Sequence, residues 1–222
     1  MYRGFILFFF VFFLDSTSLF AQLNFKVGYE MSYQDIEVTN QILQTYNEQK
    51  PWLDNSFDDI HFFQSLILGL RYRWEFVGLD LTWQKGFNRK KAEGISPFDD
   101  ANFKQVIGFS FDRYSVGYEN YYQNLGIGAS LDYNRYTAKS TINNDSKNRL
   151  FKDQNFSSIF HISYTFSNNS AIKFMLKPYV QIPWTKIKLD DLAEGLNQER
   201  SQEDLTENTT SYGLMLIFYQ GN

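Results

Sequence analysis

The sequence predicts an all-β fold, an eight-stranded antiparallel up-and-down transmembrane β-barrel with four long loops at one end. The first observation is that apolar residues recur at every second position over eight segments, which is the period of a strand with two different faces. The second is that the opposite faces carry glycines and charges of both signs. The third is that long and short connections alternate strictly. Composition agrees, because the chain is 19% aromatic and yet has a mean hydropathy of −0.40.

The N-terminal segment has the features of a signal peptide. Arg3 precedes an uncharged apolar run of ten residues, 5–14, and a small residue, Ala21, follows a polar stretch. Ten helical residues span about 15 Å, half of a bilayer core, which disfavours the alternative of an uncleaved membrane helix. We therefore expect cleavage after Ala21, with residues 1–21 as the signal peptide and residues 22–222 as one outer-membrane β-barrel domain.

The eight strands follow from the alternation, segment by segment. We expect them at residues 23–33, 66–74, 79–83, 103–118, 125–133, 160–166, 172–184 and 212–218. The fourth changes phase between Asp112 and Tyr114, which we interpret as a β-bulge; a hairpin turn is the alternative, and it would break the alternation of connections. Pro178 and Pro183 remove ladder hydrogen bonds from the seventh strand and indicate another bulge or an edge-like seam.

The second face of the strands separates a membrane barrel from a soluble β-sandwich or lipocalin-like barrel. A soluble sandwich leaves its polar face in water, where small residues such as glycine have no packing advantage. Mixed charges and small residues instead suit the crowded lumen of a narrow barrel. We assign to a lumen charge network Lys26, Glu30, Arg71, Arg73, Asp80, Lys104, Asp112, Glu119, Asp132, Lys173 and Lys177. Aromatic residues near strand ends suit the two membrane interfaces, and we assign to them Tyr33, Tyr72, Trp74, Trp83, Tyr133 and Trp184.

The connections predict the orientation of the barrel. The long ones cover residues 34–59, 85–102, 139–155 and 185–208, and the short ones lie near Glu75, at 120–124 and at 167–170. Bacterial barrels have long extracellular loops and short periplasmic turns, and an even strand count places both termini in the periplasm. Residues 39–49 are amphipathic and predict a short helix over the barrel mouth, with Thr39 as a cap and Pro51 as a stop.

Few residues suggest chemistry. The chain has no cysteine, which excludes disulfides, thiolate metal sites and cysteine nucleophiles. His61 beside Asp58 and Asp59 could activate water at the rim, but no second acidic pair stands opposite, and His161 reads as a hydrogen-bonded lumen residue. The acidic stretch 190–207 could hold Ca²⁺ loosely, yet it lacks the spacing of a calcium loop, so a solvated loop is the preferred interpretation. We therefore predict no catalytic, metal or cofactor site, and a pI near 5.2 argues against nucleic acid as a partner.

Three stretches carry a resemblance to a known family. The ending Ser18-Leu19-Phe20-Ala21-Gln22, the stretch 47–53 and the segment 125–134 resemble the small outer-membrane β-barrel proteins of Bacteroidota, and the gross shape is similar to the OmpA and OmpX type. The terminal Leu216-Ile217-Phe218-Tyr219 is similar to the signal read by the barrel-assembly machinery. The resemblance implies outer-membrane lipid, lipopolysaccharide and that machinery as partners, together with other envelope proteins. It implies no common active site.

The predicted architecture limits the function. Side chains nearly fill the lumen of an eight-stranded barrel, so a wide diffusion pore is disfavoured, and the long loops are where recognition takes place. We expect a non-enzymatic outer-membrane protein that acts as an interaction or structural subunit of an envelope complex or as a surface recognition module. The alternative is a small transport or gated-channel protein, and an enzyme acting on lipid or peptide comes third.

Overall fold

The computed structural model describes residues 23–143, 145–166, 172–196 and 204–220. The predicted signal peptide and the predicted tight turn at 167–170 lie outside these residues.

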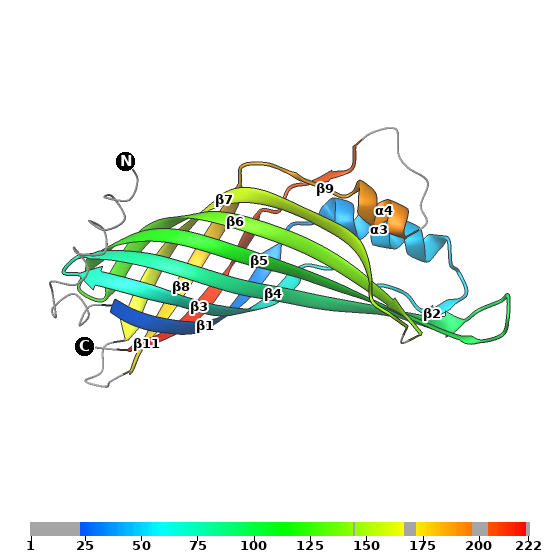
Figure 1. The fold of residues 1–222 in the computed structure, drawn as a ribbon, viewed down its shortest axis with the longest axis horizontal. Coiled ribbons are helices and arrows are strands. Elements are labelled where there is room, and N and C mark those ends of the chain that lie inside the picture. Colours follow the sequence, from blue (N-terminus) through cyan, green and yellow to red (C-terminus); the bar gives the residue numbers. More distant parts are fainter. Residues whose placement is uncertain (1–22, 144, 167–171, 197–203, 221–222) are drawn as a thin grey trace, which may run out of the picture.

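Eight strands form a closed barrel (Figure 1). Each pairs antiparallel with its neighbours along the chain, and the first pairs with the last through a register from Lys26↔Tyr219 to Gln34↔Ser211. The strands are β1 (Leu23–Gln34), β3 (Phe62–Trp74), β4 (Val77–Ile95), β5 (Asn102–Tyr122), β6 (Leu125–Ile142), β7 (Asn148–Phe166), β8 (Ile172–Pro183) and β11 (Ser211–Gln220). The predicted eight-stranded up-and-down barrel is therefore confirmed.

The outer face of the barrel is apolar where the inner face is polar. Along β3, Leu66, Leu68 and Leu70 are 40–55% exposed, whereas the alternating residues Ser65 and Arg71 are fully buried. A soluble protein shows the opposite arrangement, because water solvates arginine and excludes leucine. A continuous exposed apolar surface of this kind faces lipid in a transmembrane barrel, which excludes the soluble sandwich.

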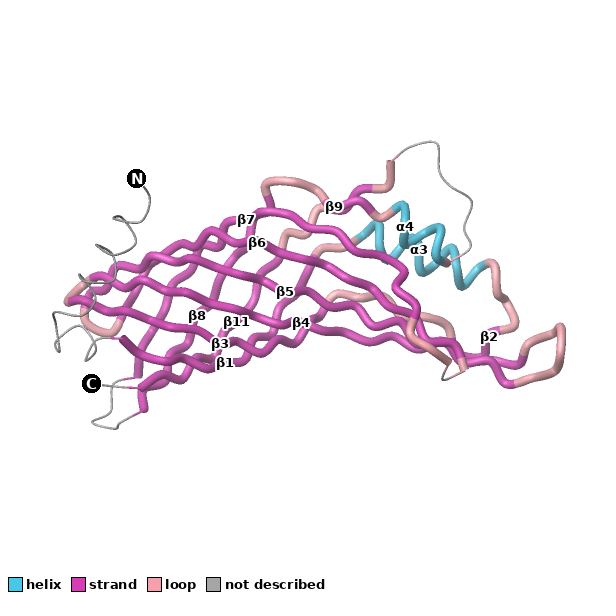
Figure 2. The backbone as a smooth tube through the Cα atoms, viewed as in Figure 1, coloured by secondary structure: helices cyan, strands magenta, loops and turns pink. Residues whose placement is uncertain are grey.

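Four strands are much longer than a membrane requires. β4, β5, β6 and β7 have 18 to 21 residues, whereas β1, β8 and β11 have 10 to 12. Because 9–11 residues cross a bilayer, the long strands extend well beyond it. Figure 2 shows them continuing past the barrel as a curved sheet that carries the two helices on one side. We call this end of the barrel the cap end and the opposite end, with the short connections, the turn end.

Two of the four predicted long loops are thus extended hairpins. The predicted connection 85–102 is mostly strand, with a turn only at 96–101, and the predicted connection 139–155 is likewise mostly β6 and β7. The other two connections contain the remaining elements, which are β2 (Leu53–Asn55), β9 (Ile187–Lys188), β10 (Thr206–Glu207), α3 (Glu37–Glu48) and α4 (Asp190–Gly195). In the part of the chain that the structure describes, no helix is long and apolar enough to cross a membrane.

The phase change in β5 is not a bulge, and the alternative of a hairpin turn is also wrong. β5 pairs with β4 from Ile95↔Asn102 to Val77↔Asn120 without a shift of register, and its pairing with β6 is equally regular. Odd-numbered residues face inward along the whole strand. Phe109 and Phe111 are apolar because protein covers the inner face at the cap end, whereas Val116 is apolar because lipid covers the outer face nearer the turn end. The face of β5 that is covered by apolar material therefore changes along the strand, while the strand register stays the same.

Pro178 also leaves the register of β8 unchanged. The ladder between β7 and β8 is interrupted opposite this proline, between the pairs His161↔Tyr179 and Tyr164↔Leu176, and then resumes in the same register. Pro183 ends the strand. The predicted edge-like interruption is therefore present beside Pro178, and the predicted bulge in β8 is absent.

Candidate functional site

The middle of the lumen holds a network of buried charges from six strands. Asp80 of β4 lies 2.9 Å from the ammonium of Lys26 and 3.4 Å from that of Lys177. Lys177 lies equally close to Glu119 of β5, which accepts a hydrogen bond of 3.1 Å from Arg71. His161 of β7 lies 3.7 Å from the same carboxylate. Buried charges are tolerated only when they are paired, and here each carboxylate compensates more than one cation.

A second cluster lies nearer the cap end and centres on Arg113. Its guanidinium contacts Glu30 at 3.4 Å and donates hydrogen bonds to Gln84 and Asn134 at 3.2 and 3.1 Å, and another to Gln181. Asp132, a predicted lumen residue, accepts hydrogen bonds from two serine hydroxyls, those of Ser130 and Ser157. Sequence reasoning missed Arg113 because it stands beside the phase change, where the alternation does not show which way a side chain points.

Four other predicted lumen charges lie elsewhere. Arg73 is half-buried at the turn end, 4.2 Å over the ring of Tyr121, and Lys173 lies on the inner face of β8 near the same end. Lys104 and Asp112 are corrections to the prediction, because they are even-numbered residues of β5 and face outward. Asp112 pairs there with Lys85 at 2.9 Å, and Lys104 lies 3.7 Å from Glu93 on the exposed surface.

Little space remains between these side chains. A cavity bordered by Lys26, Asp80, His161 and Lys177 has a volume of about 40 Å³, which suits a few water molecules at most. The middle of the lumen is therefore filled by protein.

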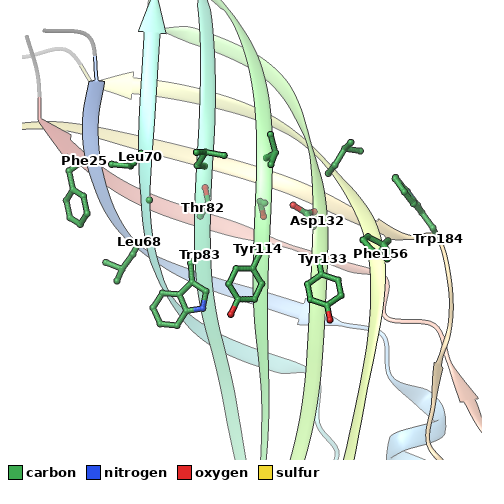
Figure 3. A pocket seen from close by; sticks show the side chains of 15 residues that line it. Phe25, Leu68, Leu70, Thr82, Trp83, Tyr114, Asp132, Tyr133, Phe156 and Trp184 are labelled. Carbon is green, nitrogen blue, oxygen red and sulfur yellow. The ribbon is translucent and has the colours of Figure 1, made fainter. Parts of the chain in front are cut away.

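The predicted interface aromatics fall into two rows on the outer face. Figure 3 shows Trp83, Tyr114 and Tyr133 side by side on neighbouring strands, and Phe156 and Trp184 continue this row at the cap end. On β1, Tyr33 stacks on Tyr212 of β11 with ring centroids 5.1 Å apart. Tyr72 and Trp74 lie at the turn end of β3, where further aromatic contacts join Phe166, Phe174 and Phe218.

The cap is a folded structure over the mouth of the barrel. We define it as α3, α4, β9 and β10, and these elements rest on a cluster of buried residues that includes Leu43, Phe111, Ala138 and Leu192. The predicted helix is present as α3 and buries Ile42, Leu43 and Tyr46. Thr39 is not its cap, since the helix begins two residues earlier, after Ile36.

Side chains of α3 bind the segment 56–61, which connects β2 to β3. Asn40 donates to the carbonyl of Ile60 at 3.1 Å and accepts from its amide at 2.8 Å. Asn47 makes the same pair of hydrogen bonds with Phe57, at 2.9 and 3.0 Å. These two clamps hold Phe57 and Ile60 against α3.

A buried carboxylate joins the first and last connections of the cap. Glu207 of β10 accepts a hydrogen bond of 2.8 Å from the backbone amide of Thr39. Burial raises the pKa of the Glu207 carboxyl above its ordinary value of 4.5, and it also raises the pKa of Tyr46, to about 12. Tyr46 hydrogen-bonds the side chain of Gln105.

The candidate catalytic and metal groups of the sequence do not form a site. His61 stacks flat on Tyr33 at 5.1 Å, and Asp59 accepts a hydrogen bond from Gln44. The acidic stretch 190–207 is described only in part: there, Asp190 accepts a hydrogen bond from the amide of Leu205, and Glu207 belongs to the cap. Among the described residues there is no group of three or more histidine and carboxylate side chains placed to hold a metal ion.

No family model matches the chain, and no curated protein matches its sequence. Among solved structures, the chain is similar to Neisserial surface protein A, with 7% identity and a TM-score of 0.39 over 90% of this chain and 96% of that one. It is similar to Ail, the attachment invasion locus protein of Yersinia pestis, with 9% identity and a TM-score of 0.42 over 89% and 96%. It is also similar to the outer membrane protease OmpT of Escherichia coli, with 9% identity and a TM-score of 0.39 over 92% and 97%.

Proposed function

We propose that this chain is a non-enzymatic integral outer-membrane β-barrel whose cap end recognises other molecules, either as a surface recognition module or as a subunit of an envelope complex. The observation that carries the proposal is the folded cap. Its two asparagine clamps, its buried carboxylate and its own apolar core hold the loops in a defined shape. Loops fixed on a rigid scaffold are where proteins place their recognition surfaces.

The outer face supports placement in an outer membrane. An apolar belt lies between the two aromatic rows, as in bacterial barrels. Pairing of Lys26 with Tyr219 puts the first and last described residues together at the turn end. With the cap facing outward, the first and last strands begin and end on the periplasmic side, at the turn end. Bacteroidota origin and export by the signal segment 1–21 remain predictions from the sequence.

The filled lumen favours recognition over the alternative of transport. Arg71, Glu119 and Lys177 are buried in the lumen, and moving them apart would separate buried charges from their partners. A gated channel is therefore the second candidate. An enzyme comes third, because His61 stacks on Tyr33 and the contact between His161 and Glu119 is buried inside the filled lumen.

The tip of the β4–β5 hairpin offers the sharpest test of recognition. Phe98, in the turn between these strands at the cap end, is 91% exposed. We expect gentle detergent extraction from native membranes, after chemical cross-linking, to recover a specific partner with the wild type and to lose it with Phe98→Ser.

Tyr122→Ser is the matched control, because this aromatic residue is 78% exposed but lies at the turn end. It should retain the partner. Recovery of the same partner with Phe98→Ser would contradict recognition by the hairpin tip, and absence of any cross-linked partner in the wild type would contradict the proposed function.

A further inference from the structure

The outer face of β4, β5 and β6 changes from apolar to cationic beyond the aromatic row. A shallow apolar groove of about 920 Å³ runs across it, bordered by Leu81, Val116 and Leu131 and by the rings of Trp83, Tyr114 and Tyr133 (Figure 3). Two residues further along each strand, the cross-strand row is Lys85, Asp112 and Arg135, in which two cations flank one carboxylate. Lys85 pairs with Asp112, whereas the buried Nε of Arg135 has no hydrogen-bond partner within the described residues.

A cationic pocket adjoins the apolar groove. It has a volume of about 470 Å³, and its described lining includes Lys85, Arg89, Lys139 and Lys147 with no acidic side chain. Its floor is Gly108, which pairs with Arg89 on one side and with Lys139 on the other. A Cβ at Gly108 would meet no atom nearer than the carbonyl oxygen of Lys139 at 4.0 Å, so the space between the two cations is open. Neighbouring strands are about 4.8 Å apart, so the backbones of the two cations are separated by about 10 Å.

We propose that this face binds an acylated saccharide that carries phosphate groups, with its acyl chains in the apolar groove and its phosphates beside Lys85 and between Arg89 and Lys139. Arginine and lysine hold phosphate through charge-assisted hydrogen bonds. The spacing selects the size of the head group. Arg89 is four residues after Lys85 in β4, which is about 13 Å along the strand. A head group with a single phosphate therefore reaches Lys85 and does not reach Arg89 and Lys139. The inference rests on the proposed membrane placement, because acyl chains reach the groove from a bilayer leaflet.

Substitutions on the outer face test the site without disturbing the lumen. The probe is bisphosphorylated lipid A, titrated against the full chain in detergent micelles and followed by tryptophan fluorescence. Arg89→Gln with Lys139→Gln should weaken binding about tenfold or more, since two charge-assisted contacts are lost. Gly108→Glu should do the same, because the open space accepts the side chain and its carboxylate occupies the phosphate position.

The control is Lys188→Gln, which removes an equally cationic side chain that is 70% exposed in the cap. It should leave lipid A binding unchanged. Equal affinity of the wild type, the double variant and Gly108→Glu would overturn the inference.

Two further probes distinguish the source of the phosphate. Dephosphorylated lipid A and phosphatidylglycerol should each bind about tenfold or more weakly than the bisphosphorylated form, because neither places phosphate at both cationic rows. Inorganic phosphate at the concentration of the lipid should not displace it. Equal binding of phosphatidylglycerol would overturn the choice of a saccharide head, and displacement by inorganic phosphate would overturn lipid as the ligand.

Failure of the proposed function gives a different result. If the wild type lacks β-sheet circular dichroism and migrates identically with and without boiling, the membrane barrel itself is wrong. If it shows both properties of a barrel and binds lipid A no better than Gly108→Glu does, only the lipid site is wrong.

Discussion

At the scale of single residues, Glu119 holds the lumen network together. It lies within 3.7 Å of Arg71, Lys177 and His161 and also accepts a hydrogen bond from Ser163. Replacement by glutamine keeps the shape and removes the charge, which leaves buried cations undercompensated. We expect Glu119→Gln to destabilise the folded barrel by about 3–5 kcal/mol, measured as a lower urea midpoint for the loss of the compact band in unboiled gels.

Glu93→Gln is the control for this prediction. Glu93 also pairs with lysines, but on the exposed surface, where solvent screens the interaction. Its urea midpoint should match the wild type. Equal midpoints for Glu119→Gln and the wild type would show that the network does not stabilise the barrel.

Sequence reasoning places a lumen residue well only where the alternation is unambiguous. Lys26, Arg71 and Asp80 stand between leucines, valines and phenylalanines that face lipid, so their own direction follows. Asp112 and Arg113 stand where the apolar face changes side. There the same pattern fits two directions, and only the strand register shows that Arg113 points inward.

At the scale of elements, the regular register of β5 predicts which face of the barrel each of its side chains occupies. Because the chain has no native cysteine, single introduced cysteines can test this prediction. Single cysteines at three positions should react according to the face and the height of each residue. Ser110→Cys, on the outer face beyond the aromatic row, should react with a water-soluble maleimide. Val116→Cys should react only with a lipid-soluble maleimide, and Ile107→Cys, fully buried under the cap, with neither.

A bulge at Asp112–Tyr114 would reverse this result. With the register shifted by one residue, Ile107 and Ser110 would exchange faces while Val116 kept its own. Labelling of Ile107→Cys by the water-soluble reagent would therefore contradict the regular strand.

The lengths of the long strands could not be read from the sequence. Residues 85–95 of β4 include several lysines, an arginine and two glycines, which read as a loop. They are a strand because β5 pairs with them to Ile95↔Asn102 and the cap covers Ala92. Beyond the membrane the outer face of β4 is in water, so the periodic apolar signal that marks a membrane strand is lost. The helix α3 was predictable, because its apolar stripe repeats locally with helical spacing.

At the scale of the whole molecule, the filled lumen predicts an electrically silent protein. Purified barrel reconstituted into planar bilayers should show no steady conductance steps under a voltage at which a porin in the same apparatus does. Reproducible steps from the wild type would favour the transport alternative. The same preparation should migrate faster in gels without boiling, which verifies that the inserted protein is folded.

The pairing of β1 with β11 also has a consequence for how the barrel closes. Every other pair among the eight barrel strands joins successive barrel strands, whereas this pair joins residues separated by nearly the whole domain, from Lys26↔Tyr219 to Gln34↔Ser211. Closing so large a loop carries the greatest entropic cost of any pairing in the barrel. The hydrogen bond from Thr39 to Glu207 joins the same two ends of the chain outside the membrane. We therefore expect the cap to act as a latch on the pair β1 and β11, so that loss of this hydrogen bond slows the closure of the barrel.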